Sequence, residues 1–202
     1  MTRLLIIIIV TIHSNQLFAQ WTQTNGPVGV SNEMVFVEGK IFLKSEYSGI
    51  QVSNDFGETW EIKWVPPSGA AQQLVKDGSR IYVSTFSALY YSDDFGDTWT
   101  SVNTQYGIGG TMSIRGDEII YHSVYGPEIW YTSDLGVSWQ ELESPVPGQY
   151  FQVELIGDEI WAQGGSSVYT SDDFGASWNE SAFNATHYID RVYNFGQNIY
   201  LG

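Results

Sequence analysis

The sequence has no cysteine at any of its 202 positions. Disulfides, thiol nucleophiles and thiolate metal sites are therefore excluded, whatever the redox state of the compartment. The fold must be held by packing and hydrogen bonds alone. Aromatic residues make up 15% of the chain, and their large side chains supply the apolar area that such packing needs.

Positive charge is also scarce. The chain has 8 lysines and arginines against 23 acidic residues, which gives a formal net charge of −15. A chain this acidic repels phosphate backbones and anionic membrane surfaces, so we expect no nucleic-acid partner. The simpler interpretation is that the surface charge serves solubility.

A long apolar run occurs only at the start of the chain. Arg3 precedes the run 4–12, which is too short to span a bilayer, and the segment 17–19 ends on a small residue. We therefore expect a signal peptide over 1–19, cleaved before Gln20, with no membrane insertion. The alternative is a buried N-terminal strand over 4–10. The ending Phe-Ala-Gln resembles signals of Gram-negative bacteria and implies a secreted, periplasmic or cell-surface protein.

Helical periodicity is absent, and short strand-like runs replace it. Within 60–98 the aromatic and β-branched runs are 60–65, 72–75, 81–85 and 88–91, separated by Pro, Gly and Asp turn signals. This plan recurs along the chain. It predicts an all-β fold built from antiparallel strand meanders.

One phrase, [Ser/Thr]-x-Asp-x-Gly-x-[Thr/Ser]-Trp, occurs four times, and its aspartates lie 39, 40 and 39 residues apart. A repeat of about 40 residues with four short strands is typical of a β-propeller blade, whereas a β-sandwich, the alternative fold, does not explain the period. We assign the repeats to 21–59, 60–98, 99–138, 139–177 and 178–202, within a propeller domain over 20–202. The motif residues are Ser53, Asp55, Gly57, Thr59, Trp60, Ser92, Asp94, Gly96, Thr98, Trp99, Thr132, Asp134, Gly136, Ser138, Trp139, Ser171, Asp173, Gly175, Ser177 and Trp178.

Each residue type in the phrase has a structural explanation. A short Asp side chain accepts hydrogen bonds from nearby backbone N–H groups, and Gly reaches a positive φ at little cost. The hydroxyl closes the turn, and the Trp buries its ring against neighbouring strands. We therefore expect a structural role for the motif, although its aspartates resemble catalytic acids.

The phrase resembles the Asp-box, or BNR repeat, found in sialidases, some xyloglucan-degrading glycosidases, sortilin-type receptors and photosystem II assembly factors. The resemblance covers about residues 21–202. It implies a propeller in which the motif lies on the turn between third and fourth strands, away from any active site.

A meander sorts its turns onto two faces, and the face opposite the motif is where propellers usually bind ligands. Aromatic and basic residues expected on its loops suit stacking on sugars or packing on a protein, or they wedge between blades. These candidates are Lys44, Tyr47, Trp64, Tyr106, His122, Tyr125, Tyr150, His187 and Tyr188.

Catalytic signatures are missing. The resemblance implies that a sialidase needs a cluster of three arginines, but Arg80 and Arg115 flank turns on the motif face and Arg191 lies near an inner strand. No acid pair stands out for glycosidase chemistry. No metal-ligand spacing or cofactor motif appears either, so we expect no metal and no cofactor.

Three functions remain open. The favoured one is an exported, non-catalytic propeller that binds a protein or glycan. The alternatives are a glycoside hydrolase of the sialidase or xyloglucanase kind, and a structural or adhesive repeat of a surface protein. The fifth repeat stops within its second strand, so we expect the sequence to be the N-terminal part of a longer protein.

Overall fold

The structure is a computed structural model, and it describes residue 27 and residues 31–45, 49–67, 69–104, 108, 112–123, 126–148, 152–181, 192–195 and 198–201. The predicted signal peptide 1–19 and the alternative strand over 4–10 lie outside these residues. Every regular element of the described part is a β-strand. The described residues contain no helix long and apolar enough to cross a membrane.

The strands form four antiparallel sheets of four and one pair, each a simple meander. The first sheet contains β1 (Ser31–Val37), β2 (Lys40–Ser45), β3 (Gly49–Ser53) and β4 (Glu61–Trp64). The second contains β5 (Ala71–Asp77), β6 (Arg80–Thr85), β7 (Leu89–Ser92) and β8 (Thr100–Val102). The third contains β9 (Met112–Arg115), β10 (Glu118–His122), β11 (Ile129–Thr132) and β12 (Gln140–Leu142). The fourth contains β13 (Gln152–Ile156), β14 (Glu159–Gly164), β15 (Ser167–Ser171) and β16 (Asn179–Glu180), and the pair is β17 (Val192–Phe195) with β18 (Asn198–Leu201).

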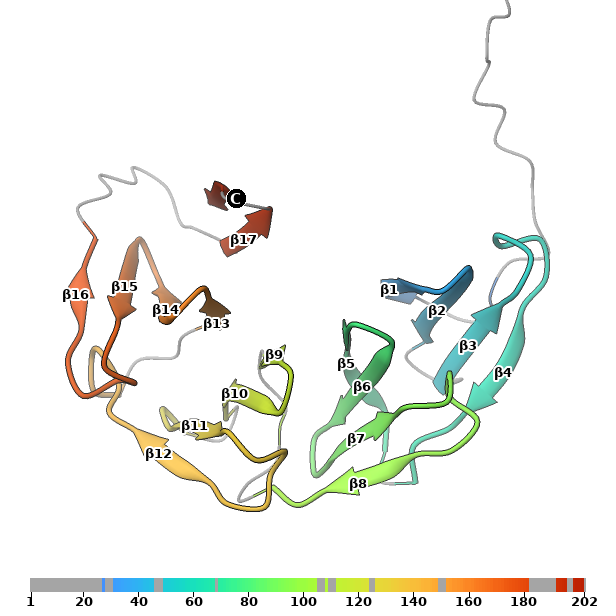
Figure 1. Cartoon of the computed structure of the whole chain (residues 1–202), viewed down its shortest axis with the longest axis horizontal. Helices are drawn as coiled ribbons and strands as arrows, with labels where there is room; N and C mark the ends of the chain where they lie inside the picture. The colour runs from blue at the N-terminus through green and yellow to red at the C-terminus, as the bar shows by residue number, and fades with distance from the viewer. Residues whose placement is uncertain are drawn as a thin grey trace, which may run out of the picture.

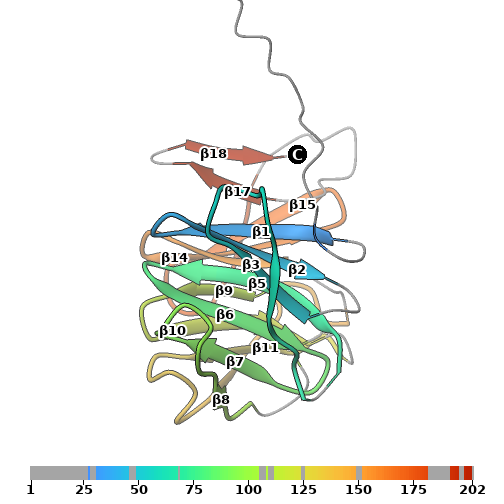
Figure 2. The same cartoon turned by 90° about the vertical axis from the view of Figure 1, so that its right-hand side faces the viewer.

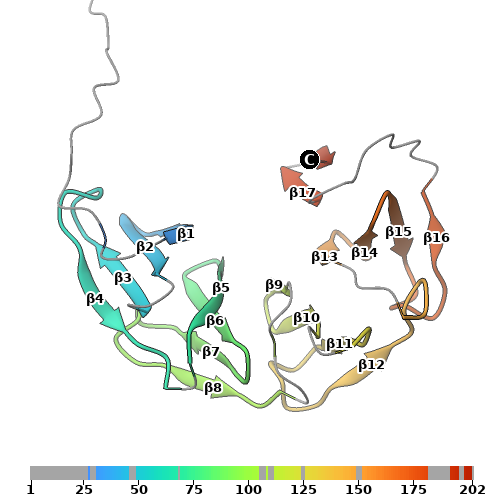
Figure 3. The same cartoon turned by 180° about the vertical axis from the view of Figure 1, so that it is seen from behind.

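The sheets stand side by side along an arc, with the first strand of each at the inner side and the fourth at the outer side (Figure 1). The view from behind shows the same order (Figure 3). This confirms the predicted all-β propeller architecture with an incomplete ring.

Turns of the sheets lie on two opposite faces of the arc, at the two sides of Figure 2. We call the side with the β1–β2 and β3–β4 turns, and their equivalents, the Asp-box face. The side with the β2–β3 loops and the connections between sheets is the loop face. The alternating direction of a meander puts the two kinds of turn on opposite faces.

Sheets and sequence repeats are offset by one strand. The repeat 60–98 supplies β4 to the first sheet and β5, β6 and β7 to the second. The strand that follows each motif therefore closes the sheet that the motif belongs to, and each repeat ties two neighbouring sheets together covalently.

The core consists of apolar layers between neighbouring sheets rather than one central cluster. Strand alternation builds these layers, since successive side chains point to opposite faces. On β6, Ile81 and Val83 pack on the first sheet, whereas Tyr82 packs towards the third. On β10, Ile119 and Ile120 divide in the same way between the second and fourth sheets.

Inner strands of neighbouring sheets are also tied by side chains that accept a backbone N–H of the next sheet. Gln73 makes one such bond with Met112, whose amide donates to Gln73 Oε1 at 2.8 Å, and its Nε2 also donates to the Met112 carbonyl at 3.2 Å. One such bond occurs at each of the three junctions. The accepting side chains are Glu33, Gln73 and Ser113, and the donating backbone amides are those of Leu74, Met112 and Leu155, respectively. These bonds satisfy inner-strand amides that have no neighbouring strand on that side.

Candidate functional site

Each Asp-box closes its turn with the same hydrogen bonds. In the second motif, Asp94 Oδ1 accepts from the Thr98 amide at 2.8 Å, and its Oδ2 accepts from the Thr98 hydroxyl at 2.6 Å. The Ser92 hydroxyl donates to Asp94 Oδ1 at 2.8 Å and accepts from the Gly96 amide at 2.7 Å. The other three motifs repeat these contacts.

These hydrogen bonds hold the aspartates ionised. The Thr98 hydroxyl, the Thr98 amide and the Ser92 hydroxyl lower the pKa of Asp94 from 3.8 to about 2. The pKa of Asp55, Asp134 and Asp173 is likewise lowered to about 2. A carboxylate with so low a pKa is poorly matched to general acid–base catalysis at neutral pH.

The turn places two successive residues in the left-handed region. Gly96 has a φ of +84°, as a glycine at this position suggests, but Phe95 before it has a φ of +59°. Phe56, Leu135 and Phe174 occupy the same slot with φ between +54° and +59°. Sequence reasoning missed this strained position, because large apolar residues rarely adopt a positive φ.

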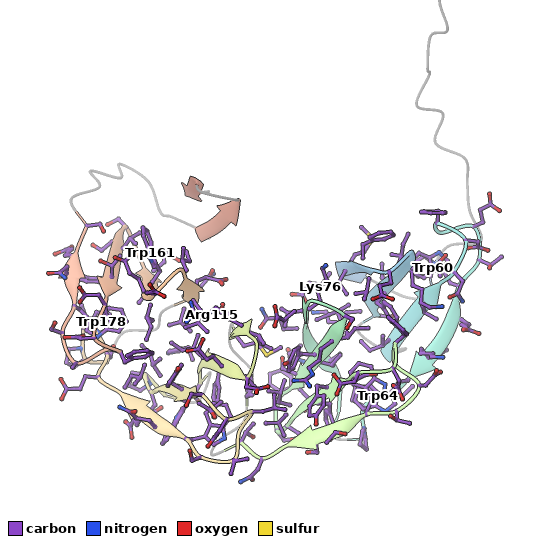
Figure 4. The ribbon with its side chains drawn as sticks, viewed as in Figure 1. Trp60, Trp64, Lys76, Arg115, Trp161 and Trp178 are labelled. Atoms are coloured by element: carbon purple, nitrogen blue, oxygen red, sulfur yellow. The ribbon has the colours of Figure 1, made fainter. Side chains whose placement is uncertain are left out.

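The motif tryptophans divide into two groups. Trp60 and Trp99 donate their indole N–H to the glycine carbonyl of their own turn, at 3.1 Å. Trp139 and Trp178 instead donate to a carbonyl at the end of the preceding sheet, Asn103 at 2.6 Å and Glu143 at 2.8 Å. Figure 4 shows Trp178 on the outer part of the fourth sheet, towards the third. These two indoles join neighbouring sheets.

Trp64, a predicted ligand-face residue, lies within a junction between sheets. A register irregularity in the β3–β4 pairing places Trp64 opposite Ile50, the slot that Val102 takes opposite Leu89 in the next sheet. Its ring, labelled in Figure 4, stacks on the ring of Trp99 with centroids 4.3 Å apart. The ring thus wedges between blades instead of presenting a free surface.

Two other candidates are buried at the ends of second strands. Lys44 is 5% exposed, and its Nζ lies 3.5 Å from Glu33 Oε2 and donates to the Gln72 carbonyl at 2.5 Å. It thus joins the first two sheets. His122 is 4% exposed, and burial lowers its pKa while the nearby Glu128 carboxylate opposes that shift. The remaining candidates, Tyr47, Tyr106, Tyr125, Tyr150, His187 and Tyr188, lie outside the described residues.

Arg80 and Arg115 lie at first-to-second strand turns on the Asp-box face, each in an ion pair. Arg80 Nε is 2.5 Å from Asp93 Oδ1, and Arg115 Nε is 2.7 Å from Glu118 Oε2. Both side chains also reach the next sheet, to Asp117 and to the Gly157 carbonyl. They therefore fasten turns, and Arg191 lies outside the described residues.

A groove of about 490 Å³ opens on the loop face of the third sheet, and we call it the β12 groove. Its walls come from the loop before β11, from β12 itself, and from the connection that leads to β13. The lining residues are Pro127, Glu128, Glu141, Leu142, Glu143, Ser144, Pro147 and Gly148. None of these residues was among the predicted candidates, which favoured aromatic side chains. The sequence feature that could have indicated the groove is the run Glu-Leu-Glu-Ser-Pro-Val-Pro-Gly over 141–148. It places two glutamates and two prolines in one connection between sheets.

Backbone and side-chain hydrogen bonds fix the walls of the groove. The Ser123 amide donates to the Glu128 carbonyl at 3.1 Å, which closes the loop before β11. The Ser144 hydroxyl donates to the Val146 carbonyl at 3.0 Å, and the Trp178 indole donates to the Glu143 carbonyl at 2.8 Å. The walls are therefore preformed, and binding need not order them.

The groove carries three carboxylates, Glu128, Glu141 and Glu143, and the described residues of its lining include no basic side chain. Within the described part of the chain, no group of three acidic, histidine or cysteine side chains is arranged to hold a metal ion. The described lining of the groove is therefore anionic.

Residues 90–101, which span the second motif, match the family model of the BNR/Asp-box repeat. The chain therefore carries an Asp-box repeat and has the fold of a β-propeller. A search against curated protein sequences finds no match.

Solved structures share this propeller architecture at low sequence identity. YCF48 from Cyanidioschyzon merolae is 16% identical with a TM-score of 0.66, and the match covers 86% of this chain and 64% of that one. YCF48 bound to D1 peptide is 16% identical with a TM-score of 0.60, covering 81% and 58%. A GH74 xyloglucanase from Xanthomonas campestris is 21% identical with a TM-score of 0.56, covering 74% and 30%. The chain thus spans less than two thirds of the length of each of these proteins.

Proposed function

We propose that this chain is an exported, non-catalytic β-propeller that binds a protein partner on its loop face. The observation that carries the proposal is the preformed β12 groove, which lies opposite the Asp-box face. On the Asp-box face, the motif aspartates and both described arginines are engaged in internal contacts. The peptide complex of a structural neighbour, YCF48, supports a protein as the partner class.

A protein fits the groove better than a glycan does. Sugar-binding sites commonly stack the sugar ring on an aromatic side chain, and the described residues that line the β12 groove include none. The predicted aromatic candidate Trp64 is occupied by its contact with Trp99.

Site-specific photo-cross-linking in the producing cell tests the proposal. A photoreactive amino acid replaces Ser144 in the groove or, as the control, Val137, which is 84% exposed at an Asp-box turn. We expect a discrete protein adduct from position 144 and none from position 137. Adducts of equal yield from both positions, or none from position 144, contradict a loop-face protein site.

Export is the second part of the proposal. The acidic chain carries an apolar run behind Arg3 and a small residue, Ala19, before Gln20. Mass spectrometry of the protein from a cell fractionation should find a mature N-terminus at Gln20 outside the cytoplasm. An intact Met1 in the cytoplasm contradicts export.

A glycoside hydrolase is the second candidate, favoured by the three glutamates that share one groove. Glycoside hydrolysis uses two carboxylates that flank the bond to be cleaved. A screen with fluorogenic sialosides and xyloglucan tests it, with Glu128→Gln and Glu141→Gln as the variants. If the unchanged chain hydrolyses a substrate and both variants do not, the result favours the hydrolase. A non-catalytic binding module predicts no hydrolysis by the unchanged chain or by either variant.

A further inference from the structure

We propose that the β12 groove takes a segment of its protein partner in which a lysine or arginine stands beside proline or aliphatic residues. This inference rests on the proposed function and names the partner's chemistry. The groove volume of about 490 Å³ is in the range that holds a few amino-acid side chains. Its open position on the loop face suits an extended segment more than an enclosed small molecule.

Charge gives the first requirement. Glu128, Glu141 and Glu143 are the ionisable side chains among the described residues of the lining, so this surface attracts cations and repels phosphate and carboxylate groups. Glu128 is half-buried and the other two are exposed. Because screening by salt is weaker for a partly buried charge, Glu128 is suited to hold the cationic head while the outer pair widens the anionic rim.

Apolar surface gives the second requirement. Pro127, Leu142 and Pro147 line the same groove, and Leu142 is buried against the fourth sheet. A lysine or arginine side chain lays its methylene stem on such a surface and keeps its charged end among carboxylates. Rigid prolines in the wall also cost little entropy when a ligand binds.

The residues of the groove disfavour other ligands. A bare divalent cation needs a compact set of oxygen ligands, and the described residues contain no such group. The described lining residues offer a sugar no aromatic ring to stack on, and an acidic peptide meets like charge. A polypeptide with a basic side chain satisfies both the carboxylates and the apolar wall.

Binding of short fluorescein-labelled peptides to the purified mature protein tests the inference. One peptide contains Arg-Pro-Leu between glycine and serine residues, a second has Lys in place of Arg, and a third has Glu in its place. Fluorescence anisotropy should show binding of the first two peptides only. Affinity should fall as salt is raised, since exposed carboxylates contribute to the contact.

The variant pair Glu141→Gln/Glu143→Gln removes two exposed charges from the groove. The matched control, Glu58→Gln/Asp172→Asn, removes two exposed charges from the Asp-box face. We expect about a tenfold loss of affinity for the Arg peptide in the groove variant and less than about a twofold loss in the control. Thermal melts check that both variants stay folded, and Glu128→Gln gives an independent third measurement.

The outcomes separate this inference from the proposed function. Equal losses in the two variants, or equal binding of the Glu peptide, overturn the cationic-segment inference. If the peptide experiments fail but position 144 still cross-links to a protein in the cell, the proposed protein binding on the loop face stands. The proposed preference of the β12 groove for a basic side chain is then wrong. If cross-linking fails as well, both are overturned.

Discussion

At the residue scale, the hydroxyl that opens each Asp-box has two roles. Ser92 is buried at 1% exposure, where its oxygen accepts the Gly96 amide and its hydrogen goes to Asp94. One small side chain thus satisfies a buried backbone donor and orients the carboxylate. The aspartate performs the complementary task at the exposed side of the turn, where it holds the amide and the hydroxyl of Thr98.

Replacing Ser92 with alanine should lower the free energy of unfolding by about 1–3 kcal/mol, because the buried Gly96 amide loses its acceptor. The control is Ser92→Thr, since Thr132 makes the equivalent bond to Gly136 in the third motif at 3.0 Å. Urea unfolding followed by tryptophan fluorescence measures both. An alanine variant as stable as the threonine variant shows that the hydroxyl is dispensable.

The Asp-box carboxylates predict how stability depends on pH. Their pKa is about 2 in the folded chain and 3.8 when free, so the folded state prefers the ionised form. This stabilisation is fully present above pH 3.8 and is lost as the pH falls through about 2. Asp94→Asn should lower the melting temperature at neutral pH and make the acid dependence shallower.

The matched control for that prediction is Asp172→Asn, which removes an exposed charge from the fourth Asp-box turn without touching its hydrogen-bonded Asp173. Melting curves between neutral pH and pH 2 measure both variants. If the two variants show the same pH dependence as the unchanged chain, Asp94 does not provide the acid sensitivity.

At the element scale, the Asp-box glycine is also a contact between sheets. Gly136 in the third sheet has a φ of +83°, and a Cβ added there would overlap with Val102 Cγ1 of the second sheet. A side chain at this position therefore meets two obstacles, the backbone conformation and the neighbouring outer strand. The third motif therefore needs glycine for packing as well as for its turn.

Gly136→Ala and Gly39→Ala separate those two obstacles. Gly39 also has a φ of +83°, but nothing lies within 4 Å of its added Cβ. Gly39→Ala should cost about 1 kcal/mol of unfolding free energy from backbone strain alone. Gly136→Ala should cost about 1–3 kcal/mol more because the sheets must separate. Urea unfolding measures both variants. If they lose the same unfolding free energy, the overlap of the new methyl group with Val102 is relieved by a small shift at no cost.

At the scale of the whole molecule, no other sheet among the described residues covers the outward face of the first sheet. Met34 is 64% exposed, whereas Leu74, at the equivalent position of the second sheet, is 4% exposed. Phe56 is 75% exposed, whereas the equivalent Phe95 packs on the first sheet. The face therefore has the composition of a sheet junction while lying open to solvent.

This open face should bind a hydrophobic dye and promote self-association of the isolated chain. Met34→Gln/Phe56→Ser should reduce dye fluorescence and the association measured by analytical ultracentrifugation. Val137→Ser, at a solitary exposed position of the third sheet, is the control. Unchanged dye binding in the double variant contradicts an accessible apolar face.

The motif spacing was sufficient to predict four similar sheets, because a 40-residue period with short strands leaves few other architectures. It could not predict the β12 groove, whose walls come from separate loops and outer-strand residues with no repeat of their own. Predicting a site from aromatic residues alone also led to Trp64, which a strand irregularity turns into a sheet junction.

The sequence by itself determined the local turns, since each Asp-box carries its donors, acceptors and glycine within eight consecutive residues. Tertiary structure decided what those turns touch. The indoles of Trp139 and Trp178 reach carbonyls of the preceding sheet, whereas Trp60 and Trp99 bond within their own turn. Motifs of the same pattern make different contacts because the position of a side chain between two sheets depends on neighbours that are distant in sequence. The anionic groove on the loop face arises for the same reason, since its walls come from separate loops.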